Sequence, residues 1–206
     1  MTAETLLSQG LSALGLSQDP APWLTWAQLL LHWNRAYNLT AIDQLEEVVS
    51  HHILDSLAIL PMIQGGRIID VGSGAGLPGL MLAIARPDWN ITLLDGNGKK
   101  TRFLQEARRV LKLANVSVVH ARAQAWQADV RFDTVTCRAL CTIEELLDWT
   151  RHLVADDGQW LAMKGRPTDE ELAAIPAAFE ITRYRVPGLD AERSVIRIHN
   201  GNQESP

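Results

Sequence analysis

The chain contains 206 residues, of which 47% are hydrophobic, 21% charged and 6% aromatic. These proportions exclude a disordered or fibrous protein, and the length suits one domain, with or without an appendage. The formal net charge of −5 excludes a uniformly basic surface, so a nucleic-acid role would require a local basic patch. The only cysteines, Cys137 and Cys141, exclude a disulfide scaffold, and the first residues lack the basic region of a signal peptide. Because no apolar run approaches the roughly 20 residues of a membrane span, we expect a cytoplasmic protein without membrane contact.

The first 60 residues carry a helical pattern. Leucines recur at helical spacing between residues 7 and 14, and a second apolar stripe runs from Trp26 to Tyr37. A third helix is expected over 44–60, where Pro61 ends it. No Gly/Ser-rich linker follows, so these helices should pack onto the rest of the chain. The pattern thus predicts a helical cap over residues 1–60, a main body over 61–200 and a frayed tail over 201–206.

From residue 66 the pattern changes to short β-branched runs that alternate with helical stretches. This alternation predicts an α/β fold with a parallel sheet covered on both faces. The expected strands cover 67–71, 91–94, 116–119 and 132–137, and the helices between them 78–86, 99–113 and 142–154. Later apolar runs occur at 159–163, 179–186 and 194–199, of which the last two lie close enough in sequence to form an antiparallel hairpin.

A glycine-rich loop follows the first expected strand and reads Asp70-Val-Gly72-Ser-Gly74-Ala-Gly76-Leu-Pro78-Gly79. Glycines permit positive φ and let a ligand approach the backbone, so this loop is expected to hold a nucleoside cofactor. Two frames compete. Gly74-x-Gly76-x-x-Gly79 matches the dinucleotide fingerprint, whereas Gly72-x-Gly74-x-Gly76 after Asp70 is typical of S-adenosylmethionine (SAM) methyltransferases. We favour the second frame, because a carboxylate at Asp70 suits the cationic end of SAM and would repel a pyrophosphate.

Two further features lie just beyond the loop. Asp95 ends the next expected strand, 23 residues after Gly72, where a carboxylate can accept hydrogen bonds from both ribose hydroxyls. Both cofactor frames predict this contact, and the alternative role of Asp95 is to cap the following helix. That helix, over 99–112, carries six basic residues against Glu106 alone, so it is either a nucleic-acid contact or a solvated helix face.

Several motifs from about residue 23 to 198 match a known family. The most specific are HxxDSL, from His52 to Leu57, and DVGSGxGLPG, from Asp70 to Gly79. Further matching segments are Trp33-Asn34, YNLT at 37–40, LLD at 93–95, KKTRFL at 99–104, FDTVTCRA at 132–139, KG at 164–165 and GLDAER at 188–193. With these motifs the chain resembles the RsmG (GidB) family, bacterial methyltransferases that act on a guanine N7 of small-subunit rRNA. It departs from the family at Gly96 and Cys137, where serines are expected, and at Gln124, where a glutamate is expected.

The resemblance implies a class I SAM-dependent methyltransferase, with a Rossmann-like seven-stranded sheet whose last strand is antiparallel. The implied reaction transfers the methyl group of SAM to N7 of one guanine in the 530 loop of 16S rRNA and leaves S-adenosyl-L-homocysteine. The implied partner is 16S rRNA or a small-subunit particle, with no obligate protein partner and a monomeric enzyme. The cofactor contacts expected from the loop and the resemblance are Asp70, Gly72, Ser73, Gly74, Gly76, Leu77, Asp95, Ala123, Gln124 and Arg138.

Guanine N7 carries a lone pair and no proton, so its methylation needs alignment rather than a general base, and neither a catalytic triad nor a metal is expected. Arg138 is expected at the transfer site, gripping guanine O6, an RNA phosphate or the SAM carboxylate, and Lys164 is expected on the RNA side. His52 and Asp55 share a helix face and would steer RNA or brace the glycine loop, with bracing favoured for Asp55. The residues expected to contact RNA are Lys99, Lys100, Arg102, Arg109, Arg122 and His52.

Two other functions are compatible with parts of the pattern. An NAD(P)-dependent oxidoreductase would use the Gly74 frame, but Tyr37 and Tyr184 lie far from any proton-relay pattern. A SAM- or RNA-binding factor without catalysis is disfavoured by the intact loop and Arg138. Most of the seven tryptophans recur at core spacing, with Trp126 as the candidate for stacking on a base.

Overall fold

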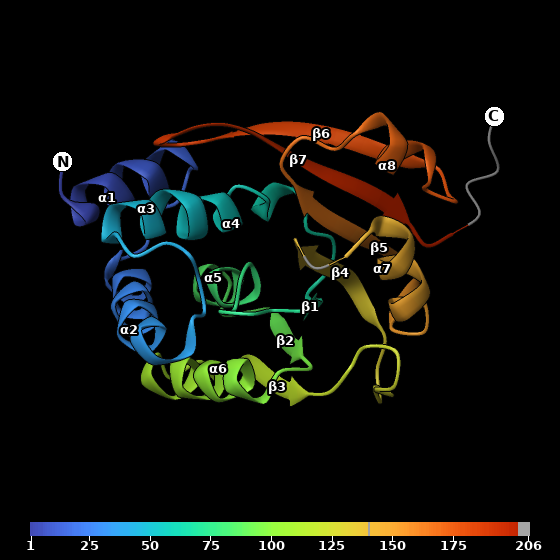
Figure 1. Cartoon of the computed structure of the whole chain (residues 1–206), viewed down its shortest axis with the longest axis horizontal. Coiled ribbons are helices and arrows are strands. Elements are labelled where there is room, and N and C mark those ends of the chain that lie inside the picture. Colours follow the sequence, from blue (N-terminus) through green and yellow to red (C-terminus); the bar gives the residue numbers. More distant parts are fainter. Residues whose placement is uncertain (140, 202–206) are drawn as a thin grey trace.

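The computed structural model describes residues 1–139 and 141–201, and residues 202–206 of the expected tail lie outside the described part. Within that part, seven strands form one sheet in the order β3-β2-β1-β4-β5-β7-β6 (Figure 1). The strands are β1 Arg67–Val71, β2 Asn90–Asp95, β3 Val116–His120, β4 Phe132–Arg138, β5 Val154–Lys164, β6 Phe179–Val186 and β7 Leu189–His199. Strands β1 to β5 pair in parallel, and β7 is antiparallel to both β5 and β6. The predicted α/β fold, with its antiparallel last strand and terminal hairpin, is therefore confirmed.

Several boundaries differ from the prediction, and β7, expected to start at residue 194, already begins at Leu189. Helix α7 (Ile143–Thr150) ends before residue 154, and β5 already begins at Val154. Leu153 and Val154 are both buried. Periodicity alone cannot tell whether such a short apolar run ends a helix or begins a buried strand. The pairing with β4 then shifts register, because Val154 pairs with Phe132 whereas Gln159 pairs with Thr134.

The predicted helices before and between the strands are present. The N-terminal ones are α1 Ala3–Ala13, α2 Ala21–Tyr37 and a continuous segment made of α3 Leu45–Val48, a π-helical turn η1 Val49–Leu54 and α4 Asp55–Leu57. A short 3₁₀ turn, η2 Leu60–Met62, leads into β1. The remaining helices are α5 Gly79–Ala85, α6 Gly98–Val110 and α8 Asp169–Ala173. Within the described residues, no helix has the length and apolar character needed to cross a membrane.

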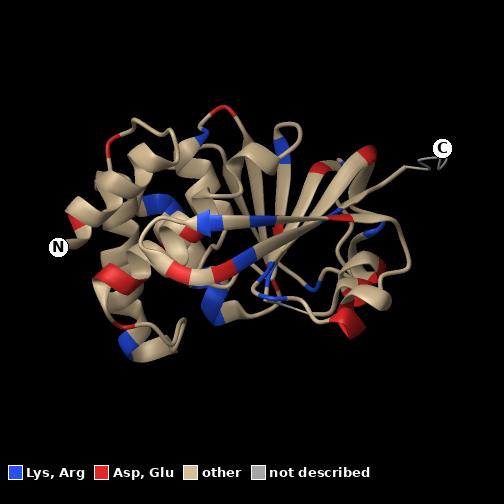
Figure 2. Ribbon diagram, turned by 90° about the horizontal axis from the view of Figure 1, so that it is seen from above, with Lys and Arg blue, Asp and Glu red and all other residues tan. Residues whose placement is uncertain are grey.

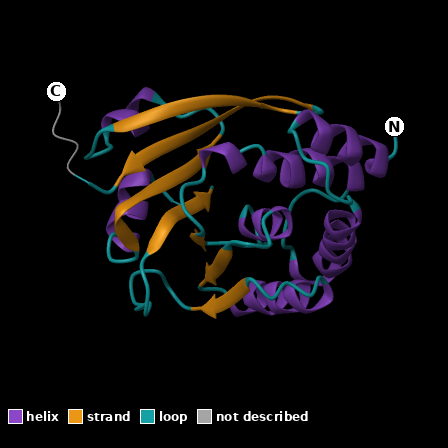
Figure 3. Ribbon diagram, turned by 180° about the vertical axis from the view of Figure 1, so that it is seen from behind, coloured by secondary structure: helices purple, strands orange, loops and turns teal. Residues whose placement is uncertain are grey.

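Apolar side chains are buried on both faces of the sheet. On one face they join the N-terminal helices, α5 and α6 in a single cluster, and on the other they join α7 and α8 (Figure 3). The N-terminal helices share their core with the sheet, since Trp23 and Trp26 are completely buried in the first cluster. Trp26 Nε1 also donates a hydrogen bond to Ala75 O, 3.2 Å away, inside the glycine-rich loop. The helices of residues 1–60 therefore pack against the glycine-rich loop and help to fix its position.

Candidate functional site

The glycine-rich loop between β1 and α5 has the conformation that its sequence predicts. Gly72, Gly74 and Gly76 have φ of +68°, +58° and +89°, a region in which side-chain-bearing residues are strained. Gly74 and Gly76 differ in the space around them. A Cβ on Gly74 would meet nothing closer than Gly72 O at 3.8 Å, whereas a Cβ on Gly76 would overlap the side chain of Leu80. Gly74 thus allows close approach to the loop, and Gly76 allows the loop to pack on α5.

The backbone N–H groups of the loop are engaged within the protein. Those of Gly72 and Ser73 donate to Leu94 O at 2.8 and 3.2 Å, and those of Gly76 and Leu77 donate to Ser73 O at 2.7 and 3.0 Å. A loop that binds pyrophosphate would instead present such groups to the anion. This loop therefore leaves few backbone N–H groups free to donate a hydrogen bond to a ligand, and a ligand would mainly pack against its surface.

Asp70 lies behind the loop and not on its surface. Its side chain is fully buried, and its Oδ2 accepts a hydrogen bond from Gly79 N, 2.9 Å away at the start of α5. The N–H that a dinucleotide loop would offer to phosphate is therefore already occupied by a carboxylate. Oδ1 has no hydrogen-bond partner among the described residues, and burial raises the pKa of Asp70 to about 7. In this arrangement Asp70 fixes the loop to α5, so the expected direct contact with the cofactor is replaced by support of the loop.

Asp95, at the end of β2, is held in place by the backbone. Its Oδ2 accepts from Gly74 N at 2.9 Å and its Oδ1 accepts from Asn97 N at 2.8 Å. The cap of α6 is Asn97, whose side chain accepts from Lys99 N, so Asp95 does not serve as that cap. Each carboxylate oxygen keeps a further lone pair, which suits the ribose contact expected from the sequence.

A pocket of about 320 Å³, which we call the loop pocket, opens on the loop at the carboxyl ends of β1 and β4. This volume lies within the roughly 300–1,000 Å³ of small-molecule sites. The lining residues are Gly72, Ser73, Gly74, Ala75 and Leu77 of the loop, Leu39, Thr40 and His52 of the N-terminal region, and Lys100, Arg138 and Ala139. Five expected cofactor contacts lie outside this lining: Asp70, Asp95, Gly76, Ala123 and Gln124. Gly76 faces Leu80, Ala123 is buried in the core of the α7 face, and Gln124 is exposed.

Arg138, the last residue of β4, connects the loop pocket to the π-helical turn η1. Its Nη1 donates to His51 O at 3.1 Å, and its Nη2 donates to His52 Nδ1 at 3.3 Å. His52 Nε2 therefore carries the proton and donates to Thr40 Oγ1, 2.8 Å away. Burial, together with the charge of Arg138, lowers the pKa of His52 to about 4. His52 is thus neutral at pH 7, so it cannot attract RNA through charge as expected, and instead it positions Arg138.

Asp55 braces the site, but its partners are not those expected. The carboxylate, 4% exposed, accepts from Tyr184 OH and Arg193 Nε, each at 3.2 Å, and lies 3.6 Å from Arg138 Nη1. It thus ties the N-terminal helices to the terminal hairpin and to Arg138, and among the described residues it makes no hydrogen bond to the glycine loop. Burial and the nearby Asp55 raise the pKa of Tyr184. Neither Tyr184 nor Arg193 was expected at the site, although Arg193 ends the GLDAER motif, which could have indicated it.

Lys164, the last residue of β5, faces a second hollow. This middle pocket, of about 500 Å³, is lined by Asp55, Arg138, Ala139, Met163, Lys164, Gly165, Tyr184 and Arg193. Lys164 Nζ donates to Cys141 O at 3.3 Å and pairs with Glu171 Oε1 at 3.2 Å, and its side chain is only 17% exposed. Arg138 and Ala139 line both pockets, and Ala139 has a strained φ of +50° at the wall between them.

The basic residues expected to contact RNA are spread from the loop pocket along α6. Lys100 lines the loop pocket, and Lys99 and Arg102 are exposed near the start of α6. Arg109 lies about 15 Å farther along the helix and pairs with Glu106 at 2.7 Å. Arg122 is exposed beside Gly96. Trp126, the stacking candidate, is half-buried and packs against Phe132 with 6.3 Å between the ring centroids.

Residues 22–196 match the GidB family, described as rRNA small subunit methyltransferase G. The chain belongs to this family. Relatives named Ribosomal RNA small subunit methyltransferase G include the protein of Legionella pneumophila, 48% identical over 97% of this chain and 96% of the relative. The protein of Chromobacterium violaceum is 49% identical over 96% of this chain and 97% of the relative. The GidB match confirms the prediction of a SAM-dependent rRNA methyltransferase over the oxidoreductase alternative.

Solved structures show the same fold at low identity. A SAM-dependent methyltransferase from Aquifex aeolicus has a TM-score of 0.57 at 15% identity, covering 79% of this chain and 96% of that one. A putative O-methyltransferase from Klebsiella pneumoniae has a TM-score of 0.59 at 13% identity, covering 91% of this chain and 93% of that one. The predicted class I methyltransferase fold is therefore confirmed, whereas the site itself has to be argued from its own residues.

Proposed function

We propose that this GidB-family protein transfers a methyl group from SAM to N7 of a guanine in the 530 loop of 16S rRNA and releases S-adenosyl-L-homocysteine. Family membership and the names of the relatives support the reaction. The observation that carries the assignment of the site is the pair of pockets that meet at Arg138, one on the glycine loop and one facing away from it. Two ligands placed in these pockets would touch at the Arg138–Ala139 wall, which is what group transfer requires.

The loop pocket fits SAM and fits a pyrophosphate poorly. Gly74 leaves room for a ligand at the backbone, Asp95 has lone pairs for ribose hydroxyls, and Asp70 occupies the helix-terminal N–H that a phosphate would need. Bound there, SAM would supply an electrophilic methyl group next to a positively charged sulfur. Gly72, Ser73, Gly74, Leu77 and Asp95 would hold it directly. Asp70 and Gly76 would fix the loop, and Ala123 and Gln124 would flank the adenine.

The middle pocket would receive the guanine. N7 needs no deprotonation, so the residues of this pocket have to orient the base and balance charge. Arg138 is fixed by His51, His52 and Asp55, which leaves its remaining N–H groups free for guanine O6. Methylation makes the ring cationic, and the buried carboxylate of Asp55 offsets the positive charge that Arg138 and Arg193 bring to the same pocket. Lys164 would line the pocket while Glu171 holds its ammonium group.

We further propose that the enzyme acts as a cytoplasmic monomer, with residues 1–60 as a cap on the SAM-binding body and with RNA as its macromolecular partner. The test uses methyl-labelled SAM and small ribosomal subunits from a strain that lacks its own enzyme of this family. We expect label in 16S rRNA. No label, together with tight binding of S-adenosyl-L-homocysteine, would identify a binding factor without catalysis and overturn the proposal.

A further inference from the structure

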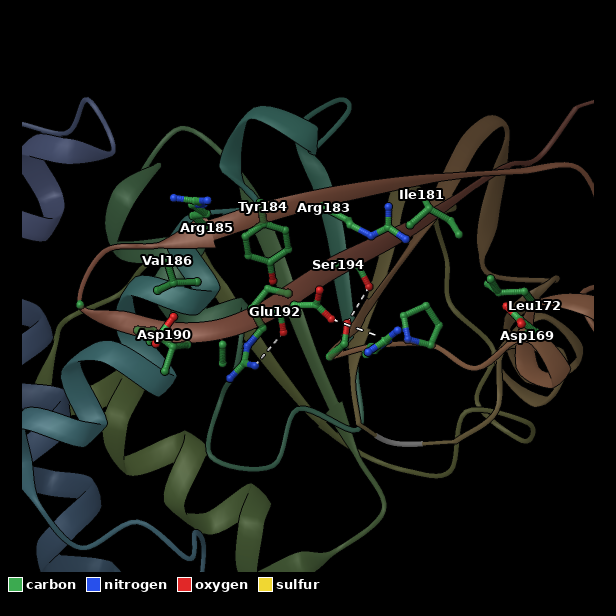
Figure 4. A pocket seen from close by; sticks show the side chains of 17 residues that line it. Asp169, Leu172, Ile181, Arg183, Tyr184, Arg185, Val186, Asp190, Glu192 and Ser194 are labelled. Atoms are coloured by element: carbon green, nitrogen blue, oxygen red, sulfur yellow. Dashed lines mark hydrogen bonds and ion pairs between the residues drawn. The ribbon is translucent and has the colours of Figure 1, made fainter.

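A third hollow continues the line of the first two. This hairpin groove, of about 1050 Å³, lies between β6–β7 and the segment from Gly165 to Leu172 (Figure 4). It shares Gly165, Tyr184 and Arg193 with the middle pocket, which in turn shares Arg138 and Ala139 with the loop pocket. The three hollows thus lie next to one another in a row from the glycine loop to the hairpin.

The sheet order decides on which side of the cofactor the acceptor lies. Asp95 ends β2 and Arg138 ends β4, and these two strands flank β1 on opposite sides. The ribose end of the cofactor is therefore directed toward β2 and the transfer site toward β4. Helix α6 packs on β2 and β3, whereas β5, β7 and β6 continue outward from β4. A nucleic acid that reaches the transfer site from the β4 side passes over the hairpin, not over α6.

The hairpin groove carries cations that have no partner in the described part of the chain. Arg183 and Arg185, two residues apart on β6, are exposed and make no ion pair or side-chain hydrogen bond among the described residues. Figure 4 shows both guanidinium groups without a dashed line. Arg166 is 86% exposed and lies 3.8 Å from Glu192, an exposed pair worth little to the fold.

The acidic residues of the groove make no ion pair with Arg183 or Arg185 among the described residues, so both arginines remain accessible. Asp190 and Asp169 lie at opposite ends of the groove in Figure 4, and Glu192 faces Arg166. Seen from above, basic and acidic segments alternate along the hairpin (Figure 2). The pairing register shifts between Tyr184 and Val186, the kind of irregularity that re-aims side chains beside active sites. The groove is therefore built to contact a flexible polyanion at a few points.

We propose that the RNA strand flanking the target guanine runs along the hairpin groove, with Arg183 and Arg185 holding its phosphates. This inference rests on the proposed function, because it takes the middle pocket as the guanine site. It replaces α6 as the main RNA surface. Contacts to phosphates position the substrate without reading its sequence, so their loss raises KM for RNA and leaves the affinity for the cofactor unchanged.

The test compares charge-matched double variants with small subunits as substrate. Arg183→Ala/Arg185→Ala removes the two groove cations, and Arg183→Lys/Arg185→Lys retains their charge. Arg131→Ala/Arg151→Ala is the control, because both arginines are exposed and precede β4 and β5, at the amino-terminal ends of these strands and away from the pockets at the carboxyl ends. Lys99→Ala/Arg102→Ala tests the α6 surface. We expect the alanine pair on β6 to raise KM for subunits about tenfold, with kcat within about twofold, and the lysine pair to recover most of the loss.

Salt dependence provides a second readout, on a protein-free RNA fragment that contains the 530 loop. Each phosphate contact makes affinity fall about threefold between 50 and 200 mM salt, so the alanine pair on β6 should weaken that fall about tenfold. Wild-type transfer without any effect of the β6 variants, or loss confined to the α6 pair, would overturn the inference while the proposed function stands. An effect on subunits without a change in the salt dependence of RNA binding would assign the groove to a ribosomal protein and also overturn it. Absence of transfer by the wild type would refute the proposed function itself.

Discussion

The different roles of Gly74 and Gly76 can be tested by replacing each glycine with alanine, which adds one methyl group. In Gly76→Ala the residue keeps a φ of +89°, which costs about 1–2 kcal/mol for a side-chain-bearing residue. Its Cβ would overlap Leu80 Cδ1 and lie 2.6 Å from Leu80 Cγ and 3.1 Å from Leu104 Cδ2. Both leucines are completely buried, so overpacking adds about 1–3 kcal/mol. The free energy of unfolding should therefore fall by about 2–5 kcal/mol.

Gly74→Ala is the matched variant. Its φ is +58° and the nearest atom to a new Cβ is Gly72 O at 3.8 Å, so only the backbone cost of about 1–2 kcal/mol applies. The added methyl group would occupy the loop pocket, and binding of S-adenosyl-L-homocysteine should weaken at least tenfold. Urea unfolding and calorimetric titration measure the two quantities. The reasoning is refuted if Gly74→Ala binds the product as the wild type does, or if Gly76→Ala loses no more stability than Gly74→Ala.

Three further variants test the buried polar groups. Folding lowers the pKa of His52 from 6.5 to about 4, so its contribution to the free energy of unfolding is complete above pH 6.5 and falls by about 3 kcal/mol down to pH 4. Urea unfolding of His52→Gln should show no such loss of stability between these pH values. An acid profile equal to that of the wild type would contradict this prediction. The pH dependence expected for Asp70 has the opposite sign. Its pKa rises from 3.8 to about 7 on folding, so its contribution to the free energy of unfolding falls by about 4 kcal/mol as the pH rises through this range. Asp70→Asn keeps an acceptor for Gly79 N, so relative to the wild type this variant should be more stable at pH 8 than at pH 5. Asp55→Asn leaves Arg138 and Arg193 without their carboxylate and should cost about 3–5 kcal/mol in urea unfolding at pH 7, whereas a loss below about 1 kcal/mol would show that the two arginines do not depend on it.

Local features of the fold could be predicted from the sequence. The positive φ of Gly72, Gly74 and Gly76 follows from a residue type that adopts it without strain, and the strands follow from short β-branched runs between turns. The position of Asp95 at a strand end was enough to place its carboxylate beside the loop. Each of these depends on a few neighbouring residues or on a rule for parallel sheets.

Features that depend on tertiary packing could not be predicted in this way. Asp70 is adjacent to the loop in sequence, but the docking of α5 decides that its carboxylate points behind the loop toward Gly79. The cluster of Asp55 with Tyr184 and Arg193 joins residues more than 125 positions apart, and no local pattern indicates it. Basic residues of α6 were recognised as charges, but only the strand order shows on which side of the cofactor they lie.

The central claim is that the loop pocket and the middle pocket together deliver a methyl group to guanine N7. The most direct measurement incubates the purified protein with SAM and unmethylated small subunits, cleaves the RNA chemically at N7-methylguanine and maps the break by primer extension. We predict one new stop in the 530 loop, which Gly74→Ala weakens when SAM is limiting. A stop elsewhere in 16S rRNA, or a methyl group on the rRNA without cleavage at guanine, would contradict the account.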